Sequence, residues 1–544
     1  MTQRAIVKCC KEMGCCDLCC LRYLGLKTPS AYENAKQVIR KLCEEPTRPE
    51  ITQQPENKLD ADPAEELSLQ ATDVGNTDST LDTDDAPPAK KMKTDSVCVS
   101  CIGVLQERNW PQCYRMVKEM LDKKGYECAT FACALTAPAA ALLREHCVAL
   151  RLSDALAHYD AASLTPLKEA WKWSFGAELA THTGKALDSG AVSPLLVTLN
   201  MEYPDEATEL EALKSLAPAL FESRRAQARR FAVEFTRRAV KQALGEAPRA
   251  ALLRHARGLA APPAPARAVA VAAAHAPLYL GGRYVKLSRA LPQTPWLVNG
   301  RRMMHSSVQE IICEPIAALY GMSAEETEHR LKFMSAGRED VDVRCLGGGR
   351  PFAIEITDPA RQPSEEELRQ LCERISDTKH VLVRSLVPVS REHLALLKKG
   401  EETKCKTYEA LCIKLSHSVD EQLAANGDTP VAVTPRDIEN INSYSNTSGD
   451  ARVLLQQRTP IRVLHRRPLL TRTRRILQLS ASAVPGHAQL FVVRVRTEAG
   501  TYIKEWAHGE LGRTRPRLAD ALGARADILA LDVTSVELDW PHAS

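Results

Sequence analysis

Charged residues occupy every second position of the sequence DVDVR: Asp340, Asp342 and Arg344. On a β-strand, side chains two residues apart share one face, so the two carboxylates would stand roughly 6–7 Å apart. That separation allows the paired-carboxylate chemistry of a glycosidase. It equally allows one catalytic aspartate held by an arginine, with the second aspartate structural. A solvated, salt-bridged face is the third interpretation, and the pattern alone does not choose among them.

The surrounding residues predict the element that would position these groups. In SAGREDVDVRCLGGGRPFAIEIT, residues 335–357, charged and apolar residues alternate after Gly337. The glycines at 347–349 predict a turn, and the alternation at 352–356 predicts a return strand. We therefore expect a β-hairpin that presents an acidic face and turns at the glycines.

Two pairs of cysteines have the spacing of a metal knuckle: Cys16, Cys19, Cys98 and Cys101. Such pairs supply the four thiolates of a tetrahedral zinc site, which would be structural because no ligand position stays open. Closing the long loop between the pairs costs only modest entropy. Four further cysteines crowd the first pair: Cys9, Cys10, Cys15 and Cys20. The ligand choice there stays open, and a set of buried or free thiols is the alternative.

The sequence RTPIRVLHRRPLLTRTRR, residues 458–475, contains seven arginines and no acid. Planar guanidinium groups bind phosphates through paired hydrogen bonds, so this run favours contact with an RNA backbone. The arginines whose register suits such a track are Arg462, Arg466, Arg467, Arg472 and Arg474. A solvated basic loop is the alternative.

Lys504 lies in GTYIKE, just after the predicted strand FVVRVRT and a turn at EAG. It could pair with a buried carboxylate from a neighbouring strand. The alternative is an ordinary hairpin lysine, which the residues alone favour.

Composition and absent motifs narrow the class of protein. The chain has 544 residues, 44% hydrophobic and 26% charged, as expected for three or four soluble domains. No apolar run approaches the roughly 20 residues of a membrane helix, and the N-terminus lacks a signal-peptide core. We therefore expect no membrane association, no secretion, and mostly reduced cysteines. Motifs for nucleotide hydrolysis, dinucleotide redox, zinc proteolysis and serine hydrolysis are absent.

Charge and composition divide the chain. Residues 44–96 contain 14 acidic and 5 basic residues and no aromatic residue, which predicts a disordered acidic linker. Because the whole chain has a net charge of +4, its remainder is basic and suits a polyanionic partner. Within the linker, PPAKKMK is either a nuclear import signal or a chance basic triplet. The expected parts are a Cys knuckle and helix at 1–43, the linker, an accessory domain at 97–270, and a larger domain at 278–544.

Four long motifs in order resemble the tRNA pseudouridine synthases of the tenth eukaryotic and archaeal class. They are GRYVKLSRALPQTPW, GREDVDVRCLGGGRPFAIEI, QRTPIRVLHRRP and GTYIKEWAHGELGRTRP. The cysteine pairs and PLKEAWKW also resemble the N-terminal part of that family. The resemblance implies an α+β protein with a zinc-bearing, THUMP-like RNA-binding accessory domain. Its pseudouridine synthase domain would carry a mixed, mostly antiparallel sheet.

The resemblance also implies roles for individual residues. The family's catalytic aspartate ends a G-R-x-D motif and therefore falls on Asp340 rather than Asp342. Arg338 would help to hold the flipped nucleotide or its phosphate, and Tyr408, in KCKTYEALC, would stack on the uracil. Lys504 would pair with the catalytic carboxylate. Two further substrate contacts are expected at Arg344 and Leu522, the latter packing against the base.

The reaction implied is isomerisation of uridine to pseudouridine at position 54 or 55 of the tRNA T-arm, without an organic cofactor. The alternatives are an RNA-binding scaffold for primary microRNA and its processing machinery, and another THUMP-bearing RNA modifier. The missing nucleotide-binding motifs count against the last of these. We expect a monomer in the nucleus and cytoplasm.

Overall fold

The computed structural model describes residues 3–44, 96–188, 190, 192–227, 233–419, 430–444 and 453–541. The linker expected at 44–96 lies outside the described residues except for Glu44 and Ser96, and the PPAKKMK motif lies outside them entirely. The chain divides into two compact units. The first comprises Met1–Lys123 and Ala129–Ala273, and the second comprises Lys124–Cys128 and Ala274–Ser544.

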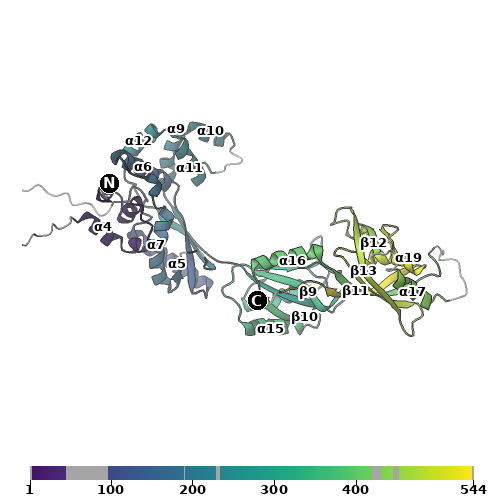
Figure 1. Cartoon of the computed structure of the whole chain (residues 1–544). Helices are drawn as coiled ribbons and strands as arrows, with labels where there is room; N and C mark the ends of the chain where they lie inside the picture. The colour runs from purple at the N-terminus through teal and green to yellow at the C-terminus, as the bar shows by residue number, and fades with distance from the viewer. Residues whose placement is uncertain are drawn as a thin grey trace, which may run out of the picture. The chain divides into compact units, whose positions relative to one another are not determined.

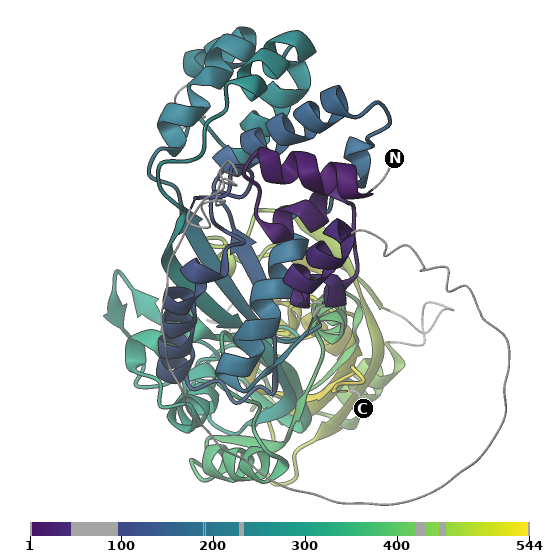
Figure 2. The same cartoon turned by 90° about the vertical axis from the view of Figure 1, so that its left-hand side faces the viewer.

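The first unit is mainly helical. Its α-helices are α1 Gln3–Glu12, α2 Asp17–Tyr23, α3 Pro29–Glu33, α4 Ala35–Cys43, α5 Trp110–Lys124, α6 Ala140–Ala155, α7 Leu167–Thr183, α8 Glu206–Leu210, α9 Ala212–Leu216, α10 Pro218–Ala226, α11 Arg237–Glu246 and α12 Arg249–Arg257. Two 3₁₀ turns, η1 Glu107–Asn109 and η2 Ala161–Ser163, connect them. In Figure 2 the purple N-terminal helices lie against α7, where α2 and α3 contact it.

A four-stranded sheet completes this unit, in the order β2-β1-β3-β4. Its strands are β1 Thr130–Thr136, β2 Ala186–Leu187, β3 Leu195–Glu202 and β4 Arg267–His275. Strand β1 runs parallel to both β2 and β3, as expected where helices connect neighbouring strands. Aromatic side chains of α7 and α5 form the core, with Trp171 stacked on Phe175 and Trp110 against the edge of Phe175.

The second unit is organised by one ten-stranded sheet in the order β10-β5-β9-β16-β11-β14-β13-β12-β15, with β8 also paired to β9. The strands are β5 Leu278–Lys286, β8 Leu331–Ser335, β9 Arg344–Ile356, β10 Val381–Pro388, β11 Lys406–Lys414, β12 Val453–Arg458, β13 Thr471–Ala483, β14 Leu490–Thr497, β15 Thr514–Arg515 and β16 Ala526–Val536. A separate small hairpin pairs β6 Leu297–Val298 with β7 Arg301–Arg302. Among the described pairs of the large sheet only β9 and β16 are parallel, which confirms the mixed, mostly antiparallel sheet.

Helices cover the two ends of this sheet differently. They are α13 Val308–Leu319, α14 Ala324–Arg330, α15 Glu365–Ser376, α16 Arg391–Thr403, α17 Pro435–Ser443, α18 Ile503–His508 and α19 Leu518–Leu522, with one 3₁₀ turn, η3 Ile461–Val463. At the β9–β10 end, α15 packs on the face of Ile354 and α16 on the opposite face, with Ala353 (Figure 1). At the other end, a buried cluster that includes Trp506 joins α17, α18 and α19 to β11, β13, β14 and β16.

The prediction of a hairpin that turns at the glycines is wrong. The glycines at 347–349 lie inside the continuous strand β9, and the turn is the loop of residues 336–343 that precedes it. Gly349 has φ +76°, and a Cβ built on it would lie 2.6 Å from the Tyr284 carbonyl oxygen. The glycines therefore form a bulge, in which β9 approaches its neighbours too closely for a side chain at Gly347 and Gly349.

No helix within the described ranges combines the length and apolar character needed to cross a lipid bilayer.

Candidate active site

Asp340 lies in the loop of residues 336–343, and a buried ion pair holds this loop in place. Glu339 and Arg350 are both buried, with Arg350 Nε 2.6 Å from Glu339 Oε2. The Tyr284 hydroxyl donates to the same carboxylate at 2.8 Å. Arg350 also donates through Nη1 to the Ala336 carbonyl at 2.9 Å. Because a buried carboxylate without partners is costly, this saturated network holds the loop in one conformation.

A fully buried lysine holds the backbone of the loop directly. Lys286, at the end of β5, donates through Nζ to the carbonyl oxygens of Asp340 at 3.0 Å, Val341 at 2.9 Å and Leu291 at 2.7 Å. Burial lowers the pKa of Lys286 to about 8. The sequence analysis missed this residue. The signal available was a lysine at the end of the mainly apolar strand LYLGGRYVK, which also contains Arg283.

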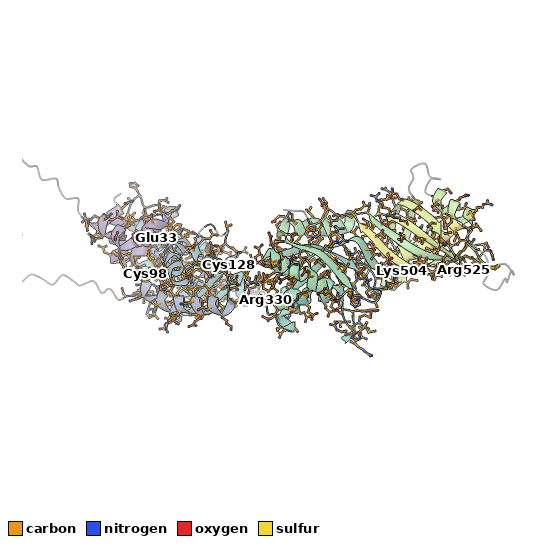
Figure 3. The ribbon with its side chains drawn as sticks, turned by 90° about the horizontal axis from the view of Figure 1, so that it is seen from below. Glu33, Cys98, Cys128, Arg330, Lys504 and Arg525 are labelled. Atoms are coloured by element: carbon orange, nitrogen blue, oxygen red, sulfur yellow. The ribbon has the colours of Figure 1, made fainter. Side chains whose placement is uncertain are left out.

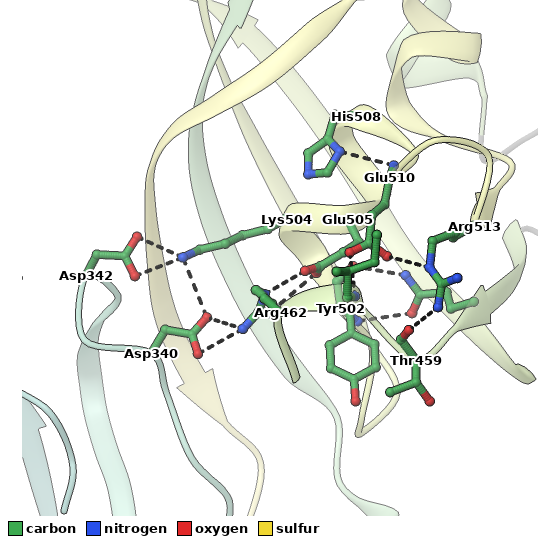
Figure 4. Close-up of polar contacts among 12 residues, drawn as sticks. Asp340, Asp342, Thr459, Arg462, Tyr502, Lys504, Glu505, His508, Glu510 and Arg513 are labelled. Carbon is green, nitrogen blue, oxygen red and sulfur yellow. Dashed lines mark hydrogen bonds and ion pairs between the residues drawn. The ribbon is translucent and has the colours of Figure 1, made fainter. Parts of the chain in front are cut away.

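Two cations contact the Asp340 carboxylate, which is 31% exposed. Arg462 Nη1 lies 2.9 Å from Oδ2 and donates to Oδ1 at 3.1 Å. Lys504 Nζ lies 3.5 Å from Oδ2 and 2.8 Å from both carboxylate oxygens of Asp342 (Figure 4). Lys504 therefore bridges the two aspartates from the first turn of α18, with Asp342 as the closer partner. Its pairing with a catalytic carboxylate stays a prediction.

The same contacts weigh against a glycosidase pair. An acid–base pair needs one carboxyl group with a raised pKa, so that it carries a proton at neutral pH. Burial acts to raise the pKa of Asp342, but the hydrogen bond and charge of Lys504 outweigh burial and lower it. Asp342 is therefore an ionised partner of Lys504 and is unsuited to act as the acid.

Tyr408 lies on β11, paired with Val495 of β14 and Val533 of β16. Its half-buried ring packs against the cluster beneath the sheet. Burial raises its pKa to about 12, and the Asp340 charge adds to the increase although Arg350 opposes it. The hydroxyl is thus protonated at neutral pH.

Arginines gather beside Asp340 with little opposite charge. Burial lowers the pKa of Arg466, and the charges of Arg338, Arg462 and Arg467 lower it further, while Asp340 partly offsets them. Arg466 and Arg467 are exposed in the segment that follows η3, and Arg338 is exposed at the start of the loop of residues 336–343. The charge of Arg338 thus acts on Arg466, in the arginine-rich segment predicted to contact RNA. The other two arginines of that track, Arg472 and Arg474, lie on β13.

Comparison with known proteins is decisive at this point. Residues 279–537 match the family model described as Pus10, C-terminal, and residues 98–274 match that of eukaryotic Pus10, N-terminal. A tRNA pseudouridine synthase Pus10 from Mus musculus is 33% identical over 97% of this chain and 96% of its own length. The chain belongs to the Pus10 family. It is accordingly an RNA pseudouridine synthase, an isomerase.

Other Pus10 relatives extend this result. The Homo sapiens tRNA pseudouridine synthase Pus10 is 34% identical over 84% of this chain and 81% of its own length. The Pus10 of the archaeon Thermofilum pendens is 34% identical over 48% of this chain and 53% of its own length. Among solved structures, a Cbf5-Nop10-Gar1 complex matches 47% of this chain and 49% of its own with 17% identity and a TM-score of 0.24, too slight a likeness to support a conclusion.

Two residues expected from the Pus10 pattern to contact the substrate make other contacts. Arg344 donates to Asp532 of the neighbouring strand β16, through Nε at 2.9 Å. Leu522, on α19, is 2% exposed and lies in the hydrophobic cluster beneath the sheet. Neither is brought to the Asp340 carboxylate by a described contact, so substrate contact by Arg344 and Leu522 stays a prediction.

The cysteine pairs of the Pus10 N-terminal part come together in the first unit, where Figure 3 labels Cys98. The Sγ atoms of Cys16, Cys19, Cys98 and Cys101 all lie within 4.8 Å of one another, and those of Cys16 and Cys101 are 3.9 Å apart. The first pair begins α2, and the second lies in a turn beyond the linker. Four clustered thiols suit a tetrahedral ion. The crowding cysteines Cys10, Cys15 and Cys20 are buried, but they do not belong to this group.

Proposed function

We propose that this chain isomerises uridine to pseudouridine in the T-arm of tRNA, at position 54 or 55, with Asp340 as the nucleophile. One observation carries the mechanism. The Asp340 carboxylate is held by Arg462 and Lys504, on a loop fixed by buried Lys286 and Arg350. A carboxylate that is partly open, oriented and charge-stabilised is prepared for attack. The names of the relatives support tRNA as the substrate class.

The chemistry redistributes atoms within one nucleotide. Asp340 attacks either the ribose carbon that bears the base or the uracil ring, and the N-glycosidic bond breaks. The base rotates and rejoins the ribose through C5, and the bond formed by Asp340 breaks so that the free carboxylate returns. The proton lost from C5 is matched by one gained at N1. The reaction therefore needs no external electron or group donor. The target must leave the base stack first, and the Tyr408 ring can stack on it.

The arginine cluster supplies the contacts that a flipped nucleotide needs. Arg338, Arg466 and Arg467 gather with few carboxylates between them, and like charges that repel each other are stabilised by a bound anion. We assign the phosphates that flank the target uridine to this cluster. Lys504 and Arg462, which already contact carboxylates, are less available for that role.

The first unit is proposed to hold zinc and to bind RNA. Thiolates of Cys16, Cys19, Cys98 and Cys101 would hold a structural zinc ion and join the segments on either side of the acidic linker. Lys168 on this unit is influenced by two further cations: burial, and then the charges of Arg237 and Lys241, lower its pKa. These cations support the THUMP-like RNA-binding role.

The test compares two aspartates in the same loop. Purified Asp340→Asn is incubated with unmodified tRNA transcript and no cofactor, and pseudouridine is mapped by position. We expect no product, and a dissociation constant for tRNA within about twofold of that of the protein without substitutions. The matched variant Asp342→Asn should still form product at the same uridine, because Lys504 then keeps Asp340 as its partner. Normal product formation by Asp340→Asn would contradict the assignment of Asp340 as the nucleophile. If the protein without substitutions binds tRNA but forms no product, the scaffold role is favoured.

A further inference from the structure

Glu505 follows Lys504 on α18, and its carboxylate is buried, with 3% of the side chain exposed. Arg462 Nε lies 2.6 Å from Oε1, and Nη2 lies 3.5 Å from Oε2. Within the described part of the chain, Arg462 makes the only side-chain contacts with this carboxylate. Figure 4 shows the resulting series of contacts, from Asp342 through Lys504 and Asp340 to Arg462 and Glu505.

Two carboxylates thus hold one guanidinium group from opposite ends. Nε of Arg462 faces Glu505, while Nη1 faces Asp340. Because the guanidinium group is planar and rigid, fixing Nε against one carboxylate fixes the direction of Nη1 toward the other. Burial lowers the pKa of Arg462, but Glu505 and then Asp340 outweigh it, so the cation is maintained.

The backbone of the same segment is held separately. Glu510 accepts a hydrogen bond from the Ile461 amide at 2.9 Å, and Arg513 donates to the Thr459 carbonyl. These contacts place η3 beside α18 (Figure 4). Glu505 is therefore not needed to dock the segment, and its contact with Arg462 selects the direction of one side chain.

The alternative position for Arg462 is on RNA, with Arg466 and Arg467. If Arg462 moved to a phosphate, the buried Glu505 charge would lose its partner, and an unpaired buried charge is strongly unfavourable. Glu505 therefore keeps Arg462 at Asp340 while the exposed arginines of the segment remain free to contact RNA.

We propose that Glu505 is a positioning residue for the isomerisation: acting through Arg462, it orients the Asp340 carboxylate. This inference rests on the proposed function, because it takes Asp340 to be the nucleophile. It separates the arginine segment into one residue that serves the chemistry and others that serve RNA binding.

The experiment is a double-mutant cycle on the full chain, with single-turnover product formation and tRNA binding as separate measurements. Glu505→Gln keeps the shape but removes the charge that aligns Arg462. We expect the rate to fall by roughly ten- to a hundredfold, as for small misplacements of reacting groups. The dissociation constant for tRNA should stay within about twofold. In an Arg462→Met background, Glu505→Gln should cause no further loss, because the group it positions is absent.

Glu537→Gln is the matched control. Glu537 pairs with Arg496 through the same geometry, Nε to Oε1 at 2.6 Å, outside the catalytic loop. It should leave the rate unchanged. If Glu505→Gln lowers the melting temperature so far that folding is lost, Glu505→Asp replaces it in the cycle, with a smaller loss of rate that again vanishes without Arg462.

Three outcomes would overturn the inference: a normal rate in Glu505→Gln, a normal rate in Arg462→Met, or losses that multiply in the double variant. If Asp340→Asn is inactive in the same assay, these results reject only the role of Glu505. If Asp340→Asn is active, the proposed nucleophile itself fails.

Discussion

Asp340 is controlled from two directions by groups of different kinds. Arg462 and Lys504 hold its carboxylate, while Lys286 holds its carbonyl oxygen from inside the fold. The side-chain contacts fix charge and orientation, and the backbone contact fixes where the loop stands. Because catalysis is sensitive to displacements of about 1 Å, the buried contact matters as much as the visible ones.

A pH effect follows at the residue scale. Below pH about 8 the Lys286 ammonium donates to three carbonyl oxygens, whereas the neutral amine has two protons and leaves one oxygen unpaired. We expect the single-turnover rate at saturating tRNA to fall as the pH rises through about 8. Tyr408, with a pKa of about 12, does not titrate in this range.

Deprotonation of Lys286 is expected to change the rate and the stability in opposite directions. The pKa of Lys286 is lowered in the folded chain, so between about 8 and its ordinary value the folded state binds fewer protons than the unfolded state. Its contribution to stability therefore rises with pH in that window. Thermal melting recorded at each pH should show no loss from this group. Lys286→Met should be slower throughout and lack the decline above pH about 8, and an unchanged decline in that variant would assign it to another group.

At the element scale, two alternating segments of the second unit show where sequence reasoning succeeds and where it stops. The alternation of FVVRVRT, residues 491–497, predicted a strand that the structure shows as Leu490–Thr497, because its two faces meet core and solvent. The alternation of DVDVR predicted a strand wrongly at Asp340 and Asp342. Which glycine makes a turn and which permits a close approach depends on distant chain segments, and here the carbonyl oxygens of Tyr284 and Thr534 decide it.

The residues of the candidate site also fall into those that local sequence motifs predict and those that they do not. Asp340, Tyr408 and Lys504 were predicted by resemblance, since each lies in a recognisable local motif, and their catalytic roles stay predictions. Lys286 and Glu505 were not found, because a buried charge is identified by the partners that compensate it. Those partners are distant in sequence: Lys286 meets residues 340 and 341, and Glu505 meets Arg462.

Substitutions in the glycine bulge test its role. Gly349→Ala puts a Cβ 2.6 Å from the Tyr284 carbonyl oxygen at φ +76°, so both contact and conformation are unfavourable. We expect the free energy of unfolding of the second unit to fall by about 2 kcal/mol or more in chemical denaturation. Gly348→Ala is the matched control, because a Cβ there meets only Arg283 Nε at 3.9 Å and φ is not positive. Equal effects of the two substitutions would show that close approach is not the reason for glycine.

At the scale of the whole molecule, the two units have separate cores and separate stabilising devices. The second unit is held by its ten-stranded sheet, with hydrophobic clusters at both ends. The first unit relies in part on a cysteine cluster whose members come from either side of the acidic linker. Around it, Arg22 is buried and donates to the Thr165 carbonyl at 2.9 Å and to Cys19 Sγ at 3.7 Å. A metal in this cluster would therefore stabilise the contacts between α2 and the rest of the first unit.

Metal removal should consequently affect one unit and spare the other. Calorimetry of the full chain is expected to show two unfolding transitions, because each unit has its own core. A strong chelator, or Cys98→Ser, should lower the temperature of one transition and release about one zinc ion per chain, since folding and metal binding are coupled. Cys43→Ser is the matched control, because Cys43 is exposed and lies outside the cluster. A single transition that shifts as a whole would mean that the units unfold together, and an unshifted scan after zinc loss would mean that the metal does not stabilise the first unit.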